Sequence, residues 1–187
     1  MTVKSVPADS EIKERYLTDR KEGFRLLYQK YSSRIFAVCR RYSADNEEAL
    51  DYFQEAMLRI DHKISSYRHK GEGSLLAWMK RLTVNMILDS IRKSDKTESI
   101  EYQKGLEDYS DVPYEDAVQI SAEQMQRMIA SLSPVKRAVF NLFCIEGYSH
   151  KEIGEALGLS EKGSSSILSR ARKELVVMIK EYIKKDI

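Results

Sequence analysis

The chain has 187 residues, a 42% share of hydrophobic residues and a formal net charge of +2. This length fits one domain or two small ones, and the apolar share is sufficient for packed cores. No run of about 18 apolar residues occurs, which argues against a membrane-spanning helix, and the polar N-terminus shows no secretory signal.

Charge is distributed unevenly along the chain. Residues 1–58 are balanced, residues 59–96 carry +5, residues 97–123 carry −7 and residues 124–187 carry +4. Charge blocks often mark solvated surface alone. Here both basic blocks coincide with motifs described below, which favours binding to a polyanion.

The first half of the chain predicts helices. After a polar tail over residues 1–20, apolar residues at helical spacing predict a long amphipathic helix over 24–38 and a second helix over 50–62. Residues 65–74 contain Gly71 and Gly73 and form a loop by composition. A strongly apolar third helix is expected over 75–93.

The second half begins with a break in this pattern. Residues 97–121 combine acidic side chains with Gly105 and Pro113, which indicates a flexible connector. A helix is expected from about Ala122, and another after Ser133, with Pro134 at its first position. Without sustained strand alternation, the predicted fold is all-α, in two modules over 21–96 and 122–187.

Residues 148–175 have the pattern of a helix-turn-helix. Ser149 and Glu152 form a capping box that begins a helix, and Gly158 can adopt the left-handed conformation that ends it. Ser160 caps a second, basic helix. Such a pair suits the DNA major groove, although an ordinary helical hairpin would share the pattern.

Catalytic and metal-binding motifs are not found. The chain has no Gly-rich phosphate loop and no HExxH, and its three histidines lie in polar surroundings that predict solvation. Cys39 and Cys144 lie far apart in apolar patterns and are expected to be reduced core residues of a cytoplasmic protein. We therefore expect no enzyme activity, metal, cofactor or small-molecule substrate; metal analysis would test the enzyme alternative.

Three segments in order, residues 49–60, 78–93 and 132–175, resemble RNA polymerase sigma factors of the extracytoplasmic-function (ECF) type. The resemblance implies a region 2 over 21–96 that binds core polymerase and the promoter −10 element. It implies a region 4 over 122–187 that binds the −35 element, and an acidic linker that threads the polymerase's RNA exit path. An anti-sigma partner is implied as well.

The resemblance also assigns site residues. Core polymerase binding falls to Asp51, Gln54 and Glu55, which share one helix face. The residues implied for the −10 region are Tyr67, Arg68, Lys70, Lys80, Asn85, Arg92 and Lys93. Those implied for the −35 region are Lys162, Ser164, Ser165, Ser166, Arg170, Arg172 and Lys173.

Simpler interpretations stand beside these assignments. The acidic residues near Asp51 could merely favour a helix N-terminus, and Asp89 could simply pair with Arg92. The second helix of the helix-turn-helix departs from the family, because Ser164–Ser166 and Ile167 stand where basic residues are usual. Serine cannot make the bidentate contact of arginine with guanine, so phosphate-led, salt-sensitive binding is expected.

The sequence therefore predicts a sigma factor that directs promoter-specific initiation through the −10 and −35 elements. The alternative is a helix-turn-helix regulator that binds duplex DNA as a dimer without polymerase. Such a regulator normally carries a phosphoacceptor or ligand-binding half, and residues 1–96 show only helices.

Overall fold

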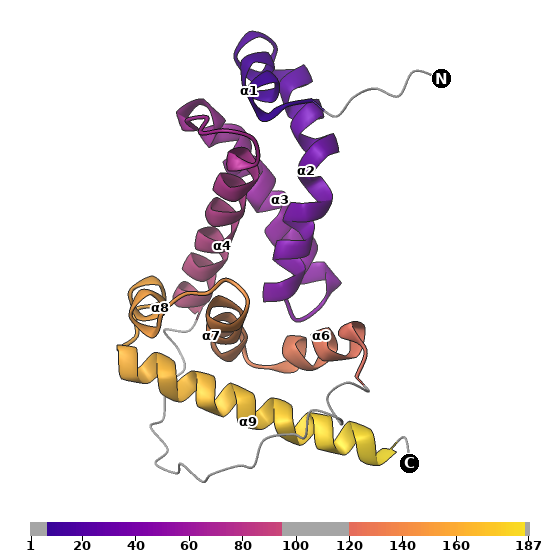
Figure 1. Cartoon of the computed structure of the whole chain (residues 1–187), viewed down its shortest axis with the longest axis vertical. Coiled ribbons are helices and arrows are strands. Elements are labelled where there is room, and N and C mark those ends of the chain that lie inside the picture. Colours follow the sequence, from indigo (N-terminus) through magenta and orange to yellow (C-terminus); the bar gives the residue numbers. More distant parts are fainter. Residues whose placement is uncertain (1–6, 95–119, 186–187) are drawn as a thin grey trace. The chain divides into compact units, whose positions relative to one another are not determined.

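The computed structural model describes residues 7–94 and 120–185, and all the regular structure within these ranges is helical (Figure 1). The chain divides into two compact units. The first comprises residues 1–40 and 45–87, and the second residues 41–44 and 88–187. The predicted connector over 97–121 lies outside the described residues except for its last two positions.

The first unit is built on α1 (Asp9–Thr18), α2 (Arg20–Tyr42), α3 (Asn46–Lys63) and α4 (Ser74–Ser94), with a short 3-10 turn at Ile64–Ser66. The ends of α2 and α4, from residues 41 and 88, belong to the second unit. The three helices predicted in this half are confirmed. Asp45 begins α3, because its side chain accepts a hydrogen bond from the Glu48 amide at 2.9 Å.

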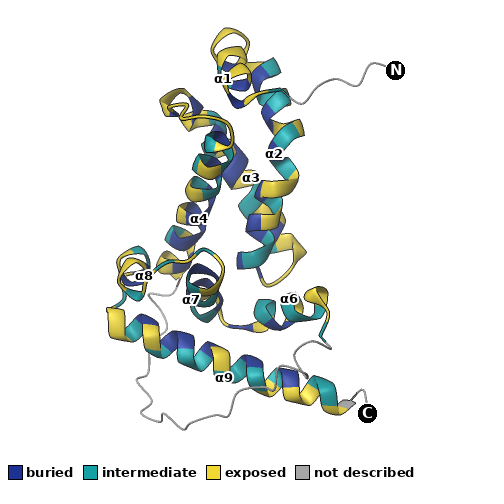
Figure 2. Ribbon diagram, in the orientation of Figure 1, coloured by how far each residue is buried: buried dark blue, intermediate teal, exposed yellow. Residues whose placement is uncertain are grey.

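Burial follows one face of each helix in this unit (Figure 2). The largest fully buried side chains of the unit are Ile12, Leu27, Tyr31, Ile35, Ile60, Leu75, Met79 and Ile87. They come from all four helices, so one shared core holds the unit together. Cys39 is buried, and this burial raises its thiol pKa to about 12.

Helix α1 corrects the expectation of a polar tail over residues 1–20. Its apolar residues Ile12 and Tyr16 are one turn apart and both buried. Only three of its ten residues are apolar, and one of them, Leu17, is exposed, so the periodic signal is weak and the sequence did not predict this helix. Gly23 of α2 lies directly beneath Tyr16, so the two backbones approach closely.

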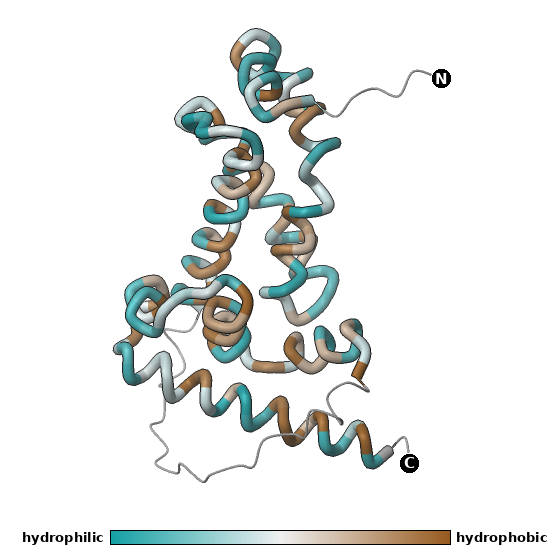
Figure 3. Tube along the Cα trace, in the orientation of Figure 1, coloured by the Kyte–Doolittle hydropathy of each residue, from teal (hydrophilic) through white to brown (hydrophobic). Residues whose placement is uncertain are grey.

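The second unit contains α6 (Ala122–Ser131), α7 (Pro134–Cys144), α8 (His150–Leu157) and α9 (Glu161–Lys185). Helix α9 packs against the other three. From the middle of α9 onwards, Ala171, Leu175 and Ile179 form a hydrophobic cluster with Met128 and Leu132. Figure 3 shows hydrophobic turns recurring along this part of α9.

Two further features bear on earlier expectations. Cys144, expected in the core, is exposed at the end of α7, so that prediction is wrong. The periodic apolar face of α7 ends at Leu142, before Cys144 is reached. Among the described residues, no helix is long and apolar enough to cross a membrane.

Candidate nucleic-acid interface

The predicted helix-turn-helix is confirmed in α8 and α9. The Ser149 amide donates to Oε2 of Glu152 at 2.8 Å, and the Glu152 amide donates to Oγ of Ser149 at 3.3 Å. The bond from the Ser149 amide, and a second from the Ser149 hydroxyl at 2.7 Å, lower the pKa of the Glu152 carboxyl group. Gly158 ends α8 in the left-handed conformation, with φ of +72°.

Removing the cap should weaken this unit measurably. We expect Ser149→Ala to lower its free energy of unfolding by about 1 kcal/mol, because the Glu152 amide in the first turn of α8 loses its hydrogen-bond acceptor. Urea denaturation followed by circular dichroism measures the change. Ser165→Ala, an exposed serine within α9, is the matched control, and an equal loss there would contradict the capping role.

The turn between α8 and α9 depends on a glycine that sequence reasoning missed. The Leu159 amide donates to the Gly154 carbonyl at 2.8 Å. A Cβ placed on Gly154 would lie 2.6 Å from the carbonyl oxygen of Leu159. The chain therefore needs glycine for close approach at this corner, and its ordinary helical setting carried no signal in the sequence.

Helix α9 presents only part of the predicted −35 set. Lys162, Ser165 and Arg172 are exposed, whereas Ser166, Arg170 and Lys173 are half-buried. Ser164 is 0% exposed, and its Oγ lies 3.0 Å from Nδ1 of His150. The structure thus contradicts a DNA contact by Ser164, because this hydroxyl joins α8 to α9 in the interior.

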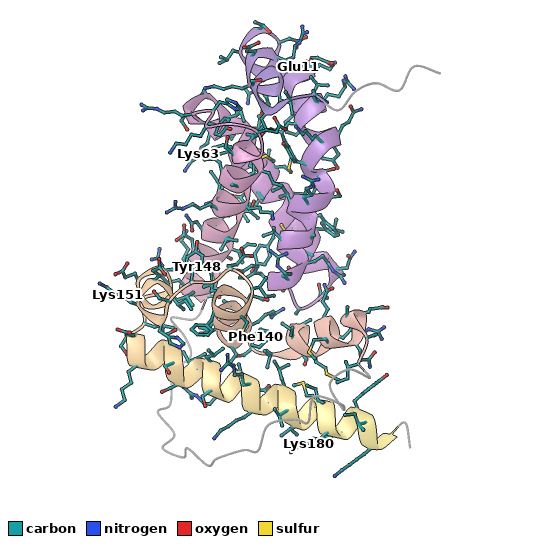
Figure 4. The ribbon with its side chains drawn as sticks, viewed as in Figure 1. Glu11, Lys63, Phe140, Tyr148, Lys151 and Lys180 are labelled. Atoms are coloured by element: carbon teal, nitrogen blue, oxygen red, sulfur yellow. The ribbon has the colours of Figure 1, made fainter. Side chains whose placement is uncertain are left out.

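His150 also departs from its expected solvation. Its ring stacks on Phe143 with centroids 4.5 Å apart, and the guanidinium of Arg172 lies over the same Phe143 ring at 5.7 Å. This stack links α7, α8 and α9 and holds the exposed Arg172 in place. Lys151, on the first turn of α8, projects outward nearby (Figure 4).

In the first unit, the loop that precedes α4 presents charged side chains. Arg68, His69 and Lys70 are exposed. Tyr67 is only 3% exposed: its ring lies 5.4 Å from that of Trp78, and its hydroxyl is 2.5 Å from Oγ of Ser74. The structure contradicts base stacking by Tyr67, which instead supports the loop from beneath.

Helix α4 also presents polar side chains to solvent. Arg81, Asn85, Arg92 and Lys93 are exposed, and Lys80 is half-buried. Arg92 donates to Asp89 at 2.8 Å, so the plain ion pair foreseen from the sequence is present. An exposed ion pair of this kind contributes little to stability.

Helix α3 presents the predicted acidic face, and two leucines with it. Asp51, Gln54 and Glu55 are exposed, and Glu55 pairs with Arg59 at 2.7 Å. Leu50 and Leu58 are 43% and 57% exposed on the same side of the helix. The sequence counted both leucines among the apolar positions of this helix, although only Ala49, Ala56, Met57 and Ile60 face the core.

The carboxylate of Asp61 joins the ends of three helices in this unit. Arg20 at the start of α2 donates to Asp61 of α3, with Nε to Oδ1 at 3.2 Å, and the Tyr16 hydroxyl of α1 donates to the same carboxylate. The bond from Arg20 is the main cause that lowers the pKa of Asp61, burial opposes it, and Tyr16 adds to it.

This pairing predicts a loss of stability in acid. Because the folded-state pKa of Asp61 lies below its ordinary value of 3.8, its contribution is complete above that pH and is lost as pH falls through the lowered pKa. We expect Asp61→Asn to lower the free energy of unfolding by about 2 kcal/mol at pH 6.

The difference between wild type and Asp61→Asn should become smaller as pH falls from 6 towards 2, because the Asp61 carboxylate becomes protonated. Urea denaturation across this range measures it, with Asp51→Asn as the control for losing an exposed carboxylate from the same helix. A difference that stays constant down to pH 2 would contradict the role of the Asp61 charge.

Two family models match this chain in order: Sigma-70 region 2 over residues 27–97 and Sigma-70 region 4 over residues 122–175. The ECF RNA polymerase sigma factor SigE of Mycolicibacterium smegmatis is 30% identical over 157 residues, covering 80% of this chain and 58% of the relative. SigM of Mycobacterium tuberculosis (H37Rv), also an ECF sigma factor, is 26% identical over 172 residues, covering 92% and 85%. The chain belongs to the ECF sigma factors.

The match to region 4 ends at residue 175, whereas α9 of this ECF sigma factor continues to Lys185. The chain spans little more than half the length of SigE. Among solved structures, a sigma factor RpoE from Bartonella quintana, crystallised with the anti-sigma factor NepR, is similar at a TM-score of 0.48 and 19% identity. It covers 84% of this chain and 96% of its own.

Proposed function

We propose that this sigma factor binds core RNA polymerase and directs it to promoters through two DNA contacts. The loop and α4 of region 2 meet the −10 element, and α9 of region 4 meets the −35 element. The observation that carries the proposal is the presence of both sigma regions, in order, on one chain. A dimeric regulator needs only the helix-turn-helix.

The −35 contact is electrostatic in character. Lys162 and Arg172 are exposed on α9, and Arg170 and Lys173 are half-buried beside them. These cations suit phosphates, while Ser165 can donate a hydrogen bond to a phosphate or a base edge. Arg172→Ala should weaken −35 binding evenly across sequences and reduce the slope of log affinity against log salt by about 1.

Because Tyr67 is buried, the proposed −10 contact depends on the charged side chains and the backbone of the loop. Arg68, His69 and Lys70 stand on the loop, followed by Gly71 and Gly73 with φ of +111° and +85°. Neither glycine has an atom within 4 Å of an added Cβ, which leaves open space beside the backbone. A base removed from the stack can be held there by a guanidinium plane and backbone groups.

Core polymerase binding is assigned to the exposed face of α3. Leu50 and Leu58 lie beside Asp51, Gln54 and Glu55, so apolar and acidic groups share one surface. Exposed leucines at this spacing suit a protein partner that buries them, while the carboxylates set its orientation through charge. The simpler interpretation of these acids as a helix-end preference does not account for the leucines.

In vitro transcription with core RNA polymerase tests the proposal. Added protein should yield transcripts whose start sites depend on both promoter elements, with binding that weakens steeply as salt rises. No complex with core and no specific transcript would overturn it. Tight binding to a palindrome by the protein alone, as a dimer, would support the regulator alternative instead.

A matched pair of double variants isolates the α3 surface. Asp51→Ala with Glu55→Ala should reduce affinity for core at least tenfold, in line with the cost of removing charges at a docking surface. Glu11→Ala with Glu14→Ala removes two exposed carboxylates from α1 and should change affinity less than twofold. Equal losses in both pairs would indicate a net-charge effect and contradict the assignment.

The same proposal includes a cytoplasmic location and an anti-sigma partner, both implied by the family. A pull-down of the intact chain from cell extract should recover polymerase subunits. Any anti-sigma factor is expected to compete with core polymerase for the protein, and a partner that binds without affecting core binding would contradict that role.

A further inference from the structure

We propose that Asp9 is a positioning residue for −10 recognition: from α1 it holds the loop over residues 67–73 and the first turn of α4 in the shape that meets DNA. The inference rests on the proposed function, because it concerns how the −10 contact is presented. Nothing in either region match includes Asp9, which lies 18 residues before the start of region 2.

Asp9 is an unusual residue for the interior. Its side chain is 0% exposed although it begins a helix whose other acidic residues, Glu11 and Glu14, are exposed. A buried carboxylate is unfavourable unless hydrogen-bond donors surround it. Both oxygens of Asp9 have such donors, and they come from two separate segments of the chain.

One oxygen of Asp9 ties α1 to α2. Oδ1 accepts from the Tyr31 hydroxyl and from Nζ of Lys30 at 3.0 Å. Burial opposes ionisation, but these bonds outweigh it and lower the pKa of Asp9. Burial, together with the hydrogen bond to Asp9, raises the pKa of Tyr31 to about 12. The carboxylate is therefore a fixed anion anchored on α2.

The other oxygen of Asp9 holds the start of α4. Oδ2 accepts from the amides of Gly73 at 2.9 Å and Leu75 at 3.2 Å. Amides at a helix N-terminus have no partner within their own helix and normally take a local side-chain cap. Here the neighbouring Ser74 hydroxyl instead bonds Gly71 and Tyr67 within the loop, and Asp9, 64 residues earlier than Gly73, supplies the acceptor.

The loop in turn supplies a hydrogen-bond acceptor, Glu72, to α1 and α2. Oε2 of Glu72 accepts from the Asp9 amide at 3.0 Å, and its Oε1 accepts from Nζ of Lys30 at 2.7 Å. Each segment thus caps the other's backbone, a reciprocal arrangement that resembles a capping box built from two distant parts of the chain. Lys13 of α1 also lies 5.7 Å over the Tyr67 ring beneath the loop.

These contacts join directly to the exposed −10 residues. Glu72 and Gly73 follow Arg68, His69 and Lys70 in the same short loop, and the two glycines give the backbone freedom to take other shapes. Ordering such a loop before DNA arrives removes part of the entropy that binding would otherwise lose. Without Asp9, the loop keeps its charged side chains but loses the hydrogen bonds from Asp9 to the Gly73 and Leu75 amides that fix its backbone.

The test measures two affinities of the same variant. Holoenzyme is reconstituted with Asp9→Ala, and its binding to a single-stranded −10 oligonucleotide and the affinity of the variant for core are measured by fluorescence anisotropy. We expect about tenfold weaker oligonucleotide binding and core affinity within twofold of wild type. Glu11→Ala, the matched carboxylate on the exposed face of α1 (Figure 4), should leave both unchanged.

Two further variants separate positioning from general stability. Asp9→Asn keeps one oxygen for the Gly73 and Leu75 amides, and its amide group can donate to Tyr31, so it should restore most of the oligonucleotide binding. Glu72→Ala alters an exposed position and should weaken that binding about threefold, which keeps the test decisive if Asp9→Ala does not fold. Hydrogen exchange of residues 67–76 should be faster in Asp9→Ala than in wild type.

Equal losses of core and oligonucleotide affinity, or unchanged oligonucleotide binding despite faster exchange, would each overturn the positioning role. So would slow, wild-type exchange of the loop in Asp9→Ala. If wild-type holoenzyme bound no −10 oligonucleotide, the proposed −10 contact itself would be overturned. The wild-type measurement comes first, so this outcome is distinguished from a failure of the Asp9 proposal.

Discussion

Replacing Gly154 by alanine is expected to destabilise the second unit by about 3 kcal/mol, even after the gain of roughly 1 kcal/mol that alanine offers in a helix. The added Cβ would stand 2.6 Å from the Leu159 carbonyl oxygen and 3.5 Å from the Glu161 amide nitrogen. Both are backbone atoms of the turn, so α8 and α9 must separate. A fall in melting temperature on the order of 10 °C should result.

Under the proposed function, DNA binding should fail with this change in geometry, because the turn sets the angle at which α9 would meet the −35 element. Calorimetry and −35 duplex binding by the holoenzyme measure the two effects. Gly163→Ala is the matched control: it also adds a methyl group to a helix of this unit, but its Cβ meets only the Ser160 hydroxyl, at 3.0 Å. Similar destabilisation at both glycines would contradict the close-approach argument.

Gly23→Ala is expected to displace α1 and destabilise the first unit by about 3 kcal/mol. The new Cβ would stand 2.6 Å from the backbone nitrogen of Tyr16 and closer still to its Cα, so no side-chain rotation relieves the clash. Displacing α1 forfeits part of the burial of Ile12 and Tyr16, which contribute about 1.5–3 kcal/mol each when fully buried.

Limited proteolysis and urea denaturation test this expectation. Cleavage within residues 7–20 should become faster in Gly23→Ala, and the unfolding midpoint should fall. Ser33→Ala changes an exposed residue of the same helix and should alter neither measurement. If α1 in Gly23→Ala resisted proteolysis as well as in wild type, the prediction would be contradicted, because α1 and α2 could then separate slightly without losing contact.

The helices of both units could be predicted because their signals are local. Capping at Ser149 and Glu152, the left-handed Gly158 and the proline at the start of α7 each act within four residues of chain. Periodic apolar residues then give each helix its inner face. Helix α1 lacked both signals, having no side-chain cap and few apolar residues, so only packing on α2 reveals it.

Exposure within the candidate site was less predictable. Tyr67 and Ser164 carry functional groups suited to DNA, yet both are buried, because Trp78 and His150 take up their polar and aromatic surfaces. Leu50 and Leu58 fit an apolar pattern, yet face outward. A residue's type says what it can bind, whereas its neighbours decide whether a ligand can reach it.

The sequence by itself determined the helical class, the helix-turn-helix and the order of the two sigma regions, since these depend on spacings of three to seven residues and on recognisable segments. Only the tertiary structure decided which of the expected DNA contacts are accessible, and that Asp9 caps α4 from a distance of 64 residues. The physical reason is the range of the interactions: helix periodicity and capping are read along the chain, whereas burial and long-range hydrogen bonds exist only once distant segments meet.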